Sequence, residues 1–303
     1  MRRFEGREGQ AIPDGHLVRV KQMNHIVEVM SLLKASNGLQ NVVKLSKTEY
    51  MLKDTGEILE YNLSENRAEN QAGLKDTFRK IRDLINNNFV GAGNELHLTL
   101  TYAENMTDTK QLHSDFHSFW KRYKRKFGNV DYLSVVEPQG RGAWHCHVLL
   151  RHNEVEKIFV PADELAKMWG NGFIKVKALE GVDNIGAYLS AYLGDVELTE
   201  DTTRLAVQLQ QENRLEIKEV IKDGLSKAYI KGGRLHMYPP GMNLYRHSKG
   251  IVFPEVQEMA YKDTKKIVGS RTPNYSRTVT IYGEDGATVL NEITYQQYNT
   301  VRG

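Results

Sequence analysis

The chain has 303 residues, of which 40% are apolar and 26% charged, and its formal net charge at pH 7 is +3. This composition is ordinary for a globular protein with a sizeable core, and the small charge permits an acidic partner without requiring one. The single cysteine, Cys146, excludes an internal disulfide framework and a cysteine-rich zinc module. No apolar stretch is long enough to span a bilayer and the N-terminus lacks a secretion signal, so we expect a cytoplasmic protein without a membrane partner.

The first 94 residues contain two recognisable elements. Residues 42–63 form two half-alternating runs around Asp54-Thr55-Gly56, which is typical of a β-hairpin. Residues 66–89 carry apolar side chains at helical spacing with Lys and Arg between them, so they predict an amphipathic helix, which GAGN at 91–94 ends. The segment before residue 36 gives only weak signals.

The next segments have clear periodicity. ELHLTLTY at 95–102 alternates strictly between two faces and predicts a strand. An apolar stripe from 109 to 127 predicts a long amphipathic helix. DYLSVVE at 131–137 and WHCHVLLR at 144–151 predict two strands that are joined by a glycine-containing turn, which makes a second hairpin.

Shorter elements complete the central part of the chain. The sequence predicts a helix over 161–169 that begins with a proline, a strand over 172–179 and a helix over 184–195. The order of strand, helix, hairpin, helix, strand and helix predicts an α+β domain, in which helices cover one face of a central, mostly antiparallel β-sheet.

The chain changes character after residue 196. It becomes polar, charged and partly helical, then rich in Gly and Pro, and it ends in a hairpin around Glu284-Asp285-Gly286. We therefore expect three parts: an N-terminal extension with a β-hairpin over 1–65, a central domain over 66–200, and a helical and irregular C-terminal extension over 201–303.

Two histidines, His145 and His147, lie one residue apart in the apolar strand WHCHVLLR. Residues i and i+2 of a strand face the same way, and two adjacent imidazoles cost stability unless something binds them, usually a divalent metal. Glu137 ends the preceding strand and can lie across the hairpin from this pair. Two nitrogen donors and one oxygen donor suit Mg²⁺ or Mn²⁺ with positions left for water or a phosphate oxygen, and zinc is also possible. The alternative is a histidine pair at the surface or in ordinary hydrogen bonds.

Two tyrosines, Tyr188 and Tyr192, are four residues apart in the predicted helix 184–195, so their hydroxyls would project from one face. Core packing is the common reason for such a pair. The functional alternative is a tyrosine nucleophile. Tyrosine is unreactive at its free pKa of about 10, and a metal that polarises the target makes its attack feasible.

Basic and aromatic residues near these motifs are candidate DNA contacts. The densest basic cluster lies in the helix 109–127 and is either a phosphate-binding surface or the solvated side of an amphipathic helix. Arg141 lies in the hairpin turn close to the expected metal site, and Trp144 is expected either to stack a base or to pack in the core. His152 and His247 are expected at the surface. The candidate DNA contacts are Thr99, Thr101, Lys121, Arg122, Lys124, Arg125, Arg141, Trp144, Lys175 and Lys177.

Three motifs in this order resemble those of the HUH endonucleases. They are HLTLTY at 97–102, GRGAWHCHVLL at 140–150 preceded by VVEPQ, and the segment with Tyr188 and Tyr192. Within that superfamily, the phrases TLTYAENMTD, IGAYLSAYLGD and LHMYPPGMNLYR are most similar to replication initiators (Rep) of Gram-positive rolling-circle plasmids and related mobile elements. The resemblance covers roughly residues 70 to 250.

The resemblance implies a fold and a mechanism. Glu137, His145 and His147 would hold one Mg²⁺ or Mn²⁺, which grips the scissile phosphate of single-stranded origin DNA. One tyrosine would attack, leaving a 5′-phosphotyrosyl bond and a free 3′-hydroxyl for a host DNA polymerase, and the second tyrosine could perform the later cleavage and rejoining. No GxxxxGK[ST] loop occurs, so a host helicase would be needed to unwind the DNA. A homodimer is possible.

The sequence departs from the family pattern at two positions. Two-tyrosine relatives often carry Lys three residues after each tyrosine, where this chain has Ala191 and Asp195. The departure leaves open which tyrosine attacks first; Lys175 and Lys177 could supply the missing charge. The alternative functions are a relaxase or transposase of the same superfamily, a non-catalytic DNA-binding regulator, and a small-molecule metalloenzyme.

Overall fold

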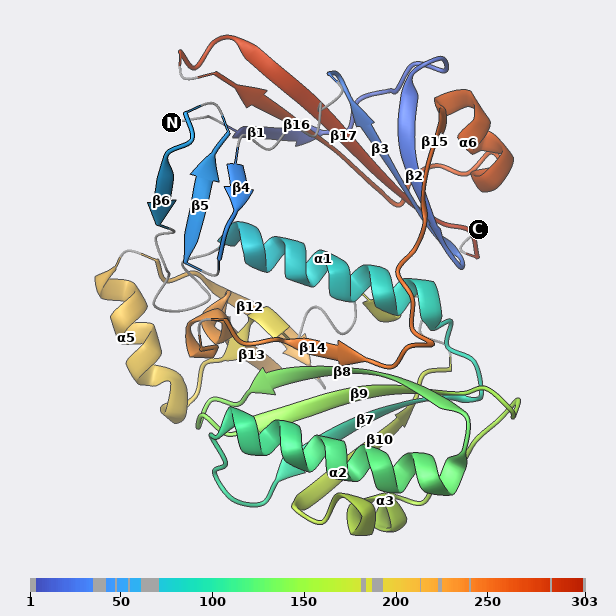
Figure 1. The fold of residues 1–303 in the computed structure, drawn as a ribbon, viewed down its shortest axis with the longest axis vertical. Coiled ribbons are helices and arrows are strands. Elements are labelled where there is room, and N and C mark those ends of the chain that lie inside the picture. Colours follow the sequence, from blue (N-terminus) through green and yellow to red (C-terminus); the bar gives the residue numbers. More distant parts are fainter. Residues whose placement is uncertain are drawn as a thin grey trace. The chain divides into compact units, whose positions relative to one another are not determined.

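The computed structural model divides into two compact units, Met1–Ser64 with Pro254–Gly303, and Glu65–Phe253. The elements of both units are labelled in Figure 1. No helix in the described ranges is long and apolar enough to cross a bilayer. The structure describes residues 4–34, 42–46, 48–53, 55–60, 71–180, 184–186, 193–212, 214–222, 225–239, 241–283 and 285–301.

The first unit is built around a six-stranded antiparallel sheet that combines both ends of the chain. Its strands, in spatial order, are β1 (Phe4–Glu8), β16 (Tyr275–Tyr282), β17 (Val289–Asn299), β3 (Ile26–Leu32), β2 (Leu17–Met23) and β15 (Val256–Ala260). The predicted C-terminal hairpin is therefore confirmed as β16 and β17. The N-terminal segment, which gave weak signals, forms β1 to β3.

A helix and a small sheet complete this unit. Helix α6 (Tyr261–Val268) contributes Val268 to a core with alternate residues of β2 and β3. Strands β4 (Val42–Lys44), β5 (Glu49–Leu52) and β6 (Ile58–Glu60) form the small antiparallel sheet. The hairpin predicted around residues 54–56 is the pair of β5 and β6.

The second unit contains a five-stranded antiparallel sheet, so the predicted α+β class is confirmed. Four of its strands agree with the predicted ones, while β14 lies in a segment that was expected to be irregular. The spatial order is β10 (Gly172–Ala178), β7 (Glu95–Tyr102), β9 (Trp144–His152), β8 (Val130–Pro138) and β14 (Tyr245–His247).

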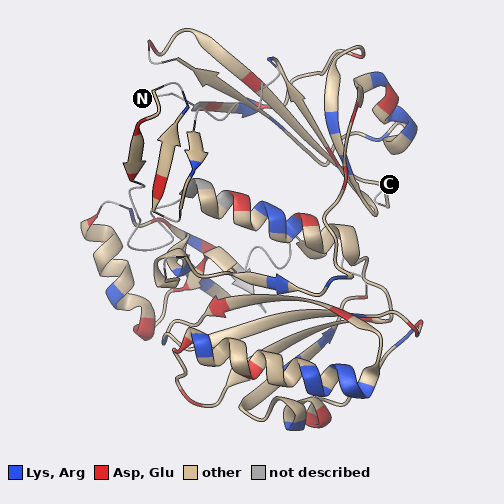
Figure 2. Cartoon of the chain, in the orientation of Figure 1, with Lys and Arg blue, Asp and Glu red and all other residues tan. Residues whose placement is uncertain are grey.

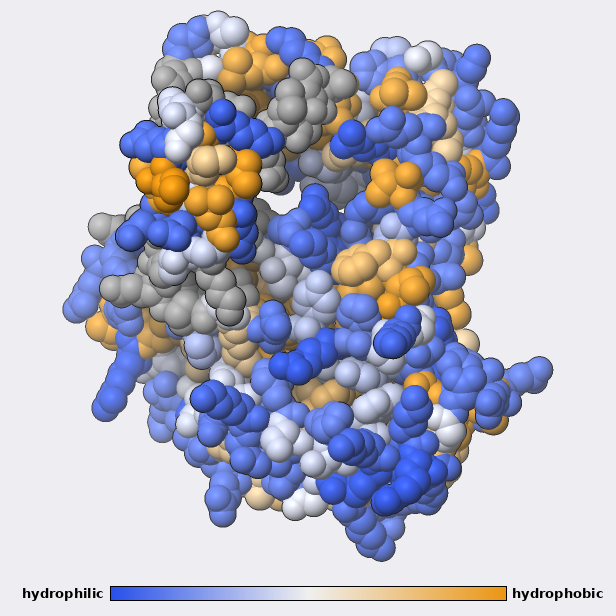
Figure 3. Space-filling model, viewed as in Figure 1, coloured by the Kyte–Doolittle hydropathy of each residue, from blue (hydrophilic) through white to orange (hydrophobic). Residues whose placement is uncertain are grey.

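One face of this sheet is covered by α2 (Thr109–Phe127) and α3 (Ala162–Trp169). The bounds of α2 follow from local chemistry, because the Asp108 carboxylate accepts hydrogen bonds from two backbone N–H groups of the first turn and Gly128 ends the helix at φ 75°. The buried stripe of α2 packs on the alternate apolar residues of β7 and β9. The outer surface over α2 is mainly hydrophilic (Figure 3).

Helix α1 (Gln71–Asn88) packs on the opposite face of the sheet. Its buried residues Ile81 and Leu84 share a core with Leu133 of β8 and Leu149 of β9. The helices expected on one face are thus α2 and α3, and α1 covers part of the other face in addition (Figure 1).

A smaller sheet follows in the same unit. It consists of β11 (Val196–Glu197), β13 (Leu225–Ile230) and β12 (Ile217–Lys222), with α5 (Thr203–Gln211) packed beside it through Leu209. Two short 3-10 helices, η2 (Glu200–Thr202) and η3 (Gly233–Met237), flank these strands in the chain. The predicted helix over 184–195 lies largely outside the described residues.

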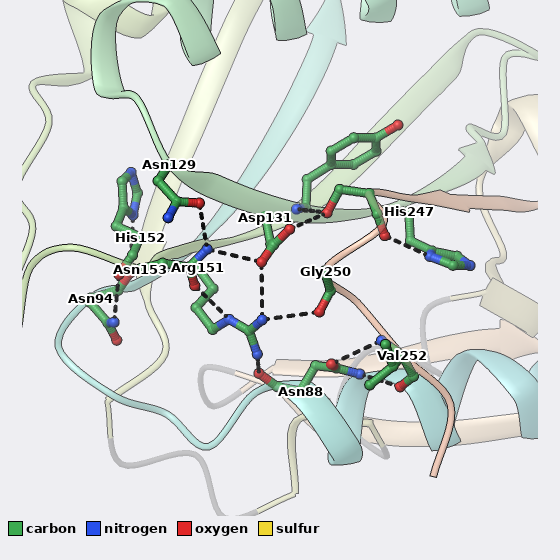
Figure 4. Close-up of polar contacts among 12 residues, drawn as sticks. Asn88, Asn94, Asn129, Asp131, Arg151, His152, Asn153, His247, Gly250 and Val252 are labelled. Carbon is green, nitrogen blue, oxygen red and sulfur yellow. Dashed lines mark hydrogen bonds and ion pairs between the residues drawn. The ribbon is translucent and has the colours of Figure 1, made fainter.

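A polar network fastens the chain after β14 to the sheet and to α1 (Figure 4). Arg151 donates to the Asp131 carboxylate at 3.1 Å, to the Asn88 carbonyl at 3.0 Å and to the Gly250 carbonyl at 3.2 Å. The expectation of a surface position for His152 is wrong, because its ring is buried and lies 2.9 Å from the Tyr123 hydroxyl.

Candidate metal centre

The β8–β9 hairpin brings Glu137, His145 and His147 together. Glu137 lies directly opposite His145 in the antiparallel register, and His147 lies two residues further along the same face. One potential ligand atom from each residue lies within 4.8 Å of the other two. The turn that sets this register is closed by hydrogen bonds of 2.7 Å from Gln139 N to Ala143 O and 2.9 Å from Gly142 N to Gln139 O.

The hydrogen bonds of the group suit a cation. His147 Nε2 lies 2.5 Å from Glu137 Oε2, and its Nδ1 lies 3.1 Å from His97 Nε2 on β7. His145 Nε2 is buried and has no hydrogen-bond partner among the described residues. Such an atom costs about 1–3 kcal/mol of stability unless a ligand satisfies it. Two imidazole nitrogens and one carboxylate therefore form a fitting donor set for a divalent metal.

Burial and neighbouring charges put these groups in the protonation states that bind metal. Burial lowers the pKa of His145 to about 4, against the opposing effect of Glu137. The pKa of His97 falls to about 3 because of burial, with His147 and Lys177 adding repulsion. Burial acts to raise the pKa of Glu137, but the hydrogen bond from His147 and the positive charge of Arg234 lower it overall. At neutral pH His145 is unprotonated and Glu137 is ionised, as ligation requires.

Arg234 is a member of the site that the sequence analysis missed. Its Nη1 lies 2.5 Å from Glu137 Oε1 and donates to the Pro138 carbonyl at 2.6 Å, while Nε donates to the Asp195 carbonyl at 2.6 Å. No spacing rule connects Arg234 with a hairpin almost a hundred residues earlier. The available signal was its position directly before LHMYPPGMNLYR, one of the phrases that carried the family resemblance.

Tyr188 and Tyr192 lie outside the described residues. On either side of them, Ile185 and Leu193 are buried in the same core as Leu149, which follows His147 on the same face of β9.

Asp195, at one of the two positions that depart from the family pattern, is described and has a structural role. Its carboxylate accepts from the backbone N–H of Gly232 at 2.9 Å and from Lys218 at 2.7 Å.

Several candidate DNA contacts share the face of the metal group. Thr101 and Thr99 on β7 lie opposite His145 and His147, and Lys175 on β10 lies opposite Thr99. Lys177 lies opposite His97. The exposed Arg141 donates to the Tyr102 carbonyl at 3.2 Å, and its charge contributes to the lowered pKa of His145 after burial and nearer groups.

Other candidates lie away from the metal group. The basic cluster of α2 covers the opposite face of the sheet (Figure 2), where Arg122 donates to the Met168 carbonyl at 2.7 Å. Trp144 is a core residue with 3% exposure, and its indole donates to the Thr107 carbonyl at 2.9 Å. The suggestion that Trp144 stacks a base is therefore corrected, because alternation along β9 turns it away from both histidines. The other basic candidates on α2 are Lys121, Lys124 and Arg125.

Comparison with known protein families gives one match. Residues 95–197 match the family described as replication-associated protein ORF2. The matched range starts with β7 and contains Glu137, His145 and His147 as well as both tyrosines. A search of curated proteins finds no match. The family match supports a role in DNA replication, as an initiator of the Rep type.

Proposed function

We propose that this protein initiates rolling-circle replication by nicking and rejoining single-stranded origin DNA in a metal-dependent reaction. The observation that carries the proposal is the group of Glu137, His145 and His147 inside the range that matches a replication-associated family. A replication protein that only binds DNA has no need for a buried His–His–Glu set with one unsatisfied imidazole nitrogen.

Each residue has a distinct part in the proposed reaction. Glu137, His145 and His147 would hold Mg²⁺ or Mn²⁺, which when bound would polarise a phosphate oxygen and offset its negative charge. His97 orients His147 through the 3.1 Å contact between their ring nitrogens. The hydroxyl oxygen of Tyr188 or Tyr192 forms a bond to the scissile phosphorus and loses its proton. The bond from phosphorus to the 3′-oxygen breaks, and that oxygen takes up a proton to become the free 3′-hydroxyl.

The reaction products define the partners that we propose. The protein stays attached to the 5′ end through a phosphotyrosyl bond, and the 3′-hydroxyl serves a host DNA polymerase in the cytoplasm. A host helicase would unwind the duplex, since the sequence has no P-loop. The second tyrosine would cleave and rejoin the DNA after one round.

A labelled-strand assay tests this function. The protein is incubated with Mn²⁺ and a tiled set of single strands from the DNA that flanks its gene, each labelled at the 3′ or the 5′ end. We expect a covalent adduct that keeps the 3′ label and a free, polymerase-extendable fragment that keeps the 5′ label. The double substitution Tyr188→Phe and Tyr192→Phe, and separately His145→Ala, should abolish the adduct. The two single tyrosine substitutions identify the residue that attacks first.

Two results would contradict the proposal. DNA binding without any adduct would favour a non-catalytic regulator. An adduct that survives the loss of both tyrosines would show that another residue is the nucleophile.

A further inference from the structure

Strand β10, which pairs with β7, carries an exposed aromatic residue and two lysines on one face. Phe173 is 70% exposed, and Lys175 and Lys177 are also exposed. The intervening Ile174 and Val176 turn to the other face and pack against the core under α2 and α3. We call Phe173, Lys175 and Lys177 the β10 stripe.

The sheet register places the β10 stripe beside the metal group. Phe173 lies opposite Thr101, which lies opposite His145, which lies opposite Glu137, so one row of paired positions crosses the sheet from the stripe to the carboxylate. Paired residues of adjacent strands point to the same face. With strands about 4.8 Å apart, Phe173 lies roughly 10 Å from His145 across the sheet.

The chemistry of the stripe fits single-stranded DNA. Lys175 and Lys177 are two residues apart and therefore about 6.8 Å from each other along the strand, a spacing similar to that of neighbouring phosphates in an extended strand. An exposed aromatic ring next to a basic track is how proteins stack unpaired bases without selecting a sequence. The basic cluster of α2 lacks this arrangement, since it lies on the other face and its Lys126 is paired with Glu164.

We infer that the nucleotides adjoining the scissile phosphate run along β10, with one base stacked on Phe173 and consecutive phosphates at Lys175 and Lys177. This inference rests on the proposed function, because it assumes that a single strand reaches the metal group. The other reason for lysines on an exposed strand is protection against pairing with a second chain. The experiment below separates the two.

Binding of a fluorescent single strand is measured by anisotropy with the full chain, in a Tyr188→Phe, Tyr192→Phe background so that cleavage does not contribute. We expect Phe173→Ala to weaken binding about tenfold and Phe173→Tyr to retain it, because base stacking contributes roughly 1–3 kcal/mol. The pair Lys175→Gln and Lys177→Gln should reduce the slope of log Kd against log salt by about 1.4, or about 0.7 for each phosphate that a lysine no longer neutralises.

Matched controls come from exposed residues elsewhere. Phe159→Ala removes an aromatic side chain that is 85% exposed, and Lys121→Gln with Lys124→Gln removes two charges from α2. Both should bind as the parent does.

Unchanged affinity and salt slope in the β10 variants, in a protein whose wild type still forms the adduct, would overturn the inference and leave the proposed function standing. Self-association of the lysine variant without loss of DNA affinity would also overturn it, in favour of edge protection. A wild type that neither binds nor cleaves any strand would overturn both.

Discussion

Replacing Arg234 with Gln should tighten the binding of Mn²⁺ to the DNA-free protein. The Arg234 side chain is only 13% exposed, and its Nη1 lies 2.5 Å from Glu137 Oε1. His147 contacts the other oxygen of the same carboxylate. A cation that binds Glu137 must therefore approach a fixed positive charge and compete with it for the carboxylate. Glutamine removes the charge but keeps an N–H donor for the Asp195 and Pro138 carbonyls.

The magnitude follows from Coulomb's law. A divalent cation about 5 Å from a guanidinium is repelled by about 1.7 kcal/mol even at a dielectric constant near 80, and by more in a less polar environment. One factor of ten in affinity corresponds to about 1.4 kcal/mol. We therefore expect Mn²⁺ to bind roughly tenfold more tightly to the Arg234→Gln variant, less any loss from a more mobile Glu137.

Mn²⁺ titration followed by calorimetry or by the EPR signal of the free ion measures this affinity without DNA. Arg234→Lys keeps the charge and should bind as the wild type does, whereas Glu137→Gln should bind much more weakly. If the folded Arg234→Gln variant binds Mn²⁺ as weakly as the wild type or more weakly, Arg234 supports the geometry of the site and does not oppose the cation.

Three further predictions concern positioning and stability. Substituting His97→Ala should weaken Mn²⁺ binding about tenfold, because His147 loses its orienting contact; an unchanged titration would refute this role. Substituting Arg151→Met should lower the free energy of unfolding in urea by about 2 kcal/mol, since three acceptors lose their donor, and a change below about 0.5 kcal/mol would contradict the importance of that network. Burial acts to raise the pKa of Asp131, yet hydrogen bonds from Ser248, Asn153 and Arg151 lower it. The stability that this ionised group contributes is thus present above its unfolded pKa of about 3.9 and is lost as the pH falls through the lower folded value. The Asp131→Asn variant should therefore lose less stability than the wild type on acidification, and parallel pH profiles in chemical denaturation would contradict this.

Much of the site was predictable because it is local in the sequence. Alternation in WHCHVLLR placed both histidines on one face, and the short turn after Glu137 left little freedom in how the hairpin pairs. Alternation also assigns Trp144 to the face of Cys146, opposite the histidines, so its core position followed from the same pattern.

The contacts from distant segments were not predictable in this way. Arg234 reaches Glu137 from η3, and β14 adds to the sheet through Tyr245 opposite Val135. In the other unit, β1 pairs with β16, with Phe4 opposite Ile281. Periodicity shows which side of an element is buried but not which element covers it.

The sequence by itself determined the α+β class, the ends of α2 and the His–His–Glu set, because each depends on side-chain periodicity, a cap or a short turn. Only the tertiary structure decided that β10 lies beside β7, so that Phe173 shares a row with His145, and that a guanidinium neutralises Glu137. Such contacts depend on which surfaces pack together once long loops have closed, and no local pattern of residues encodes that choice.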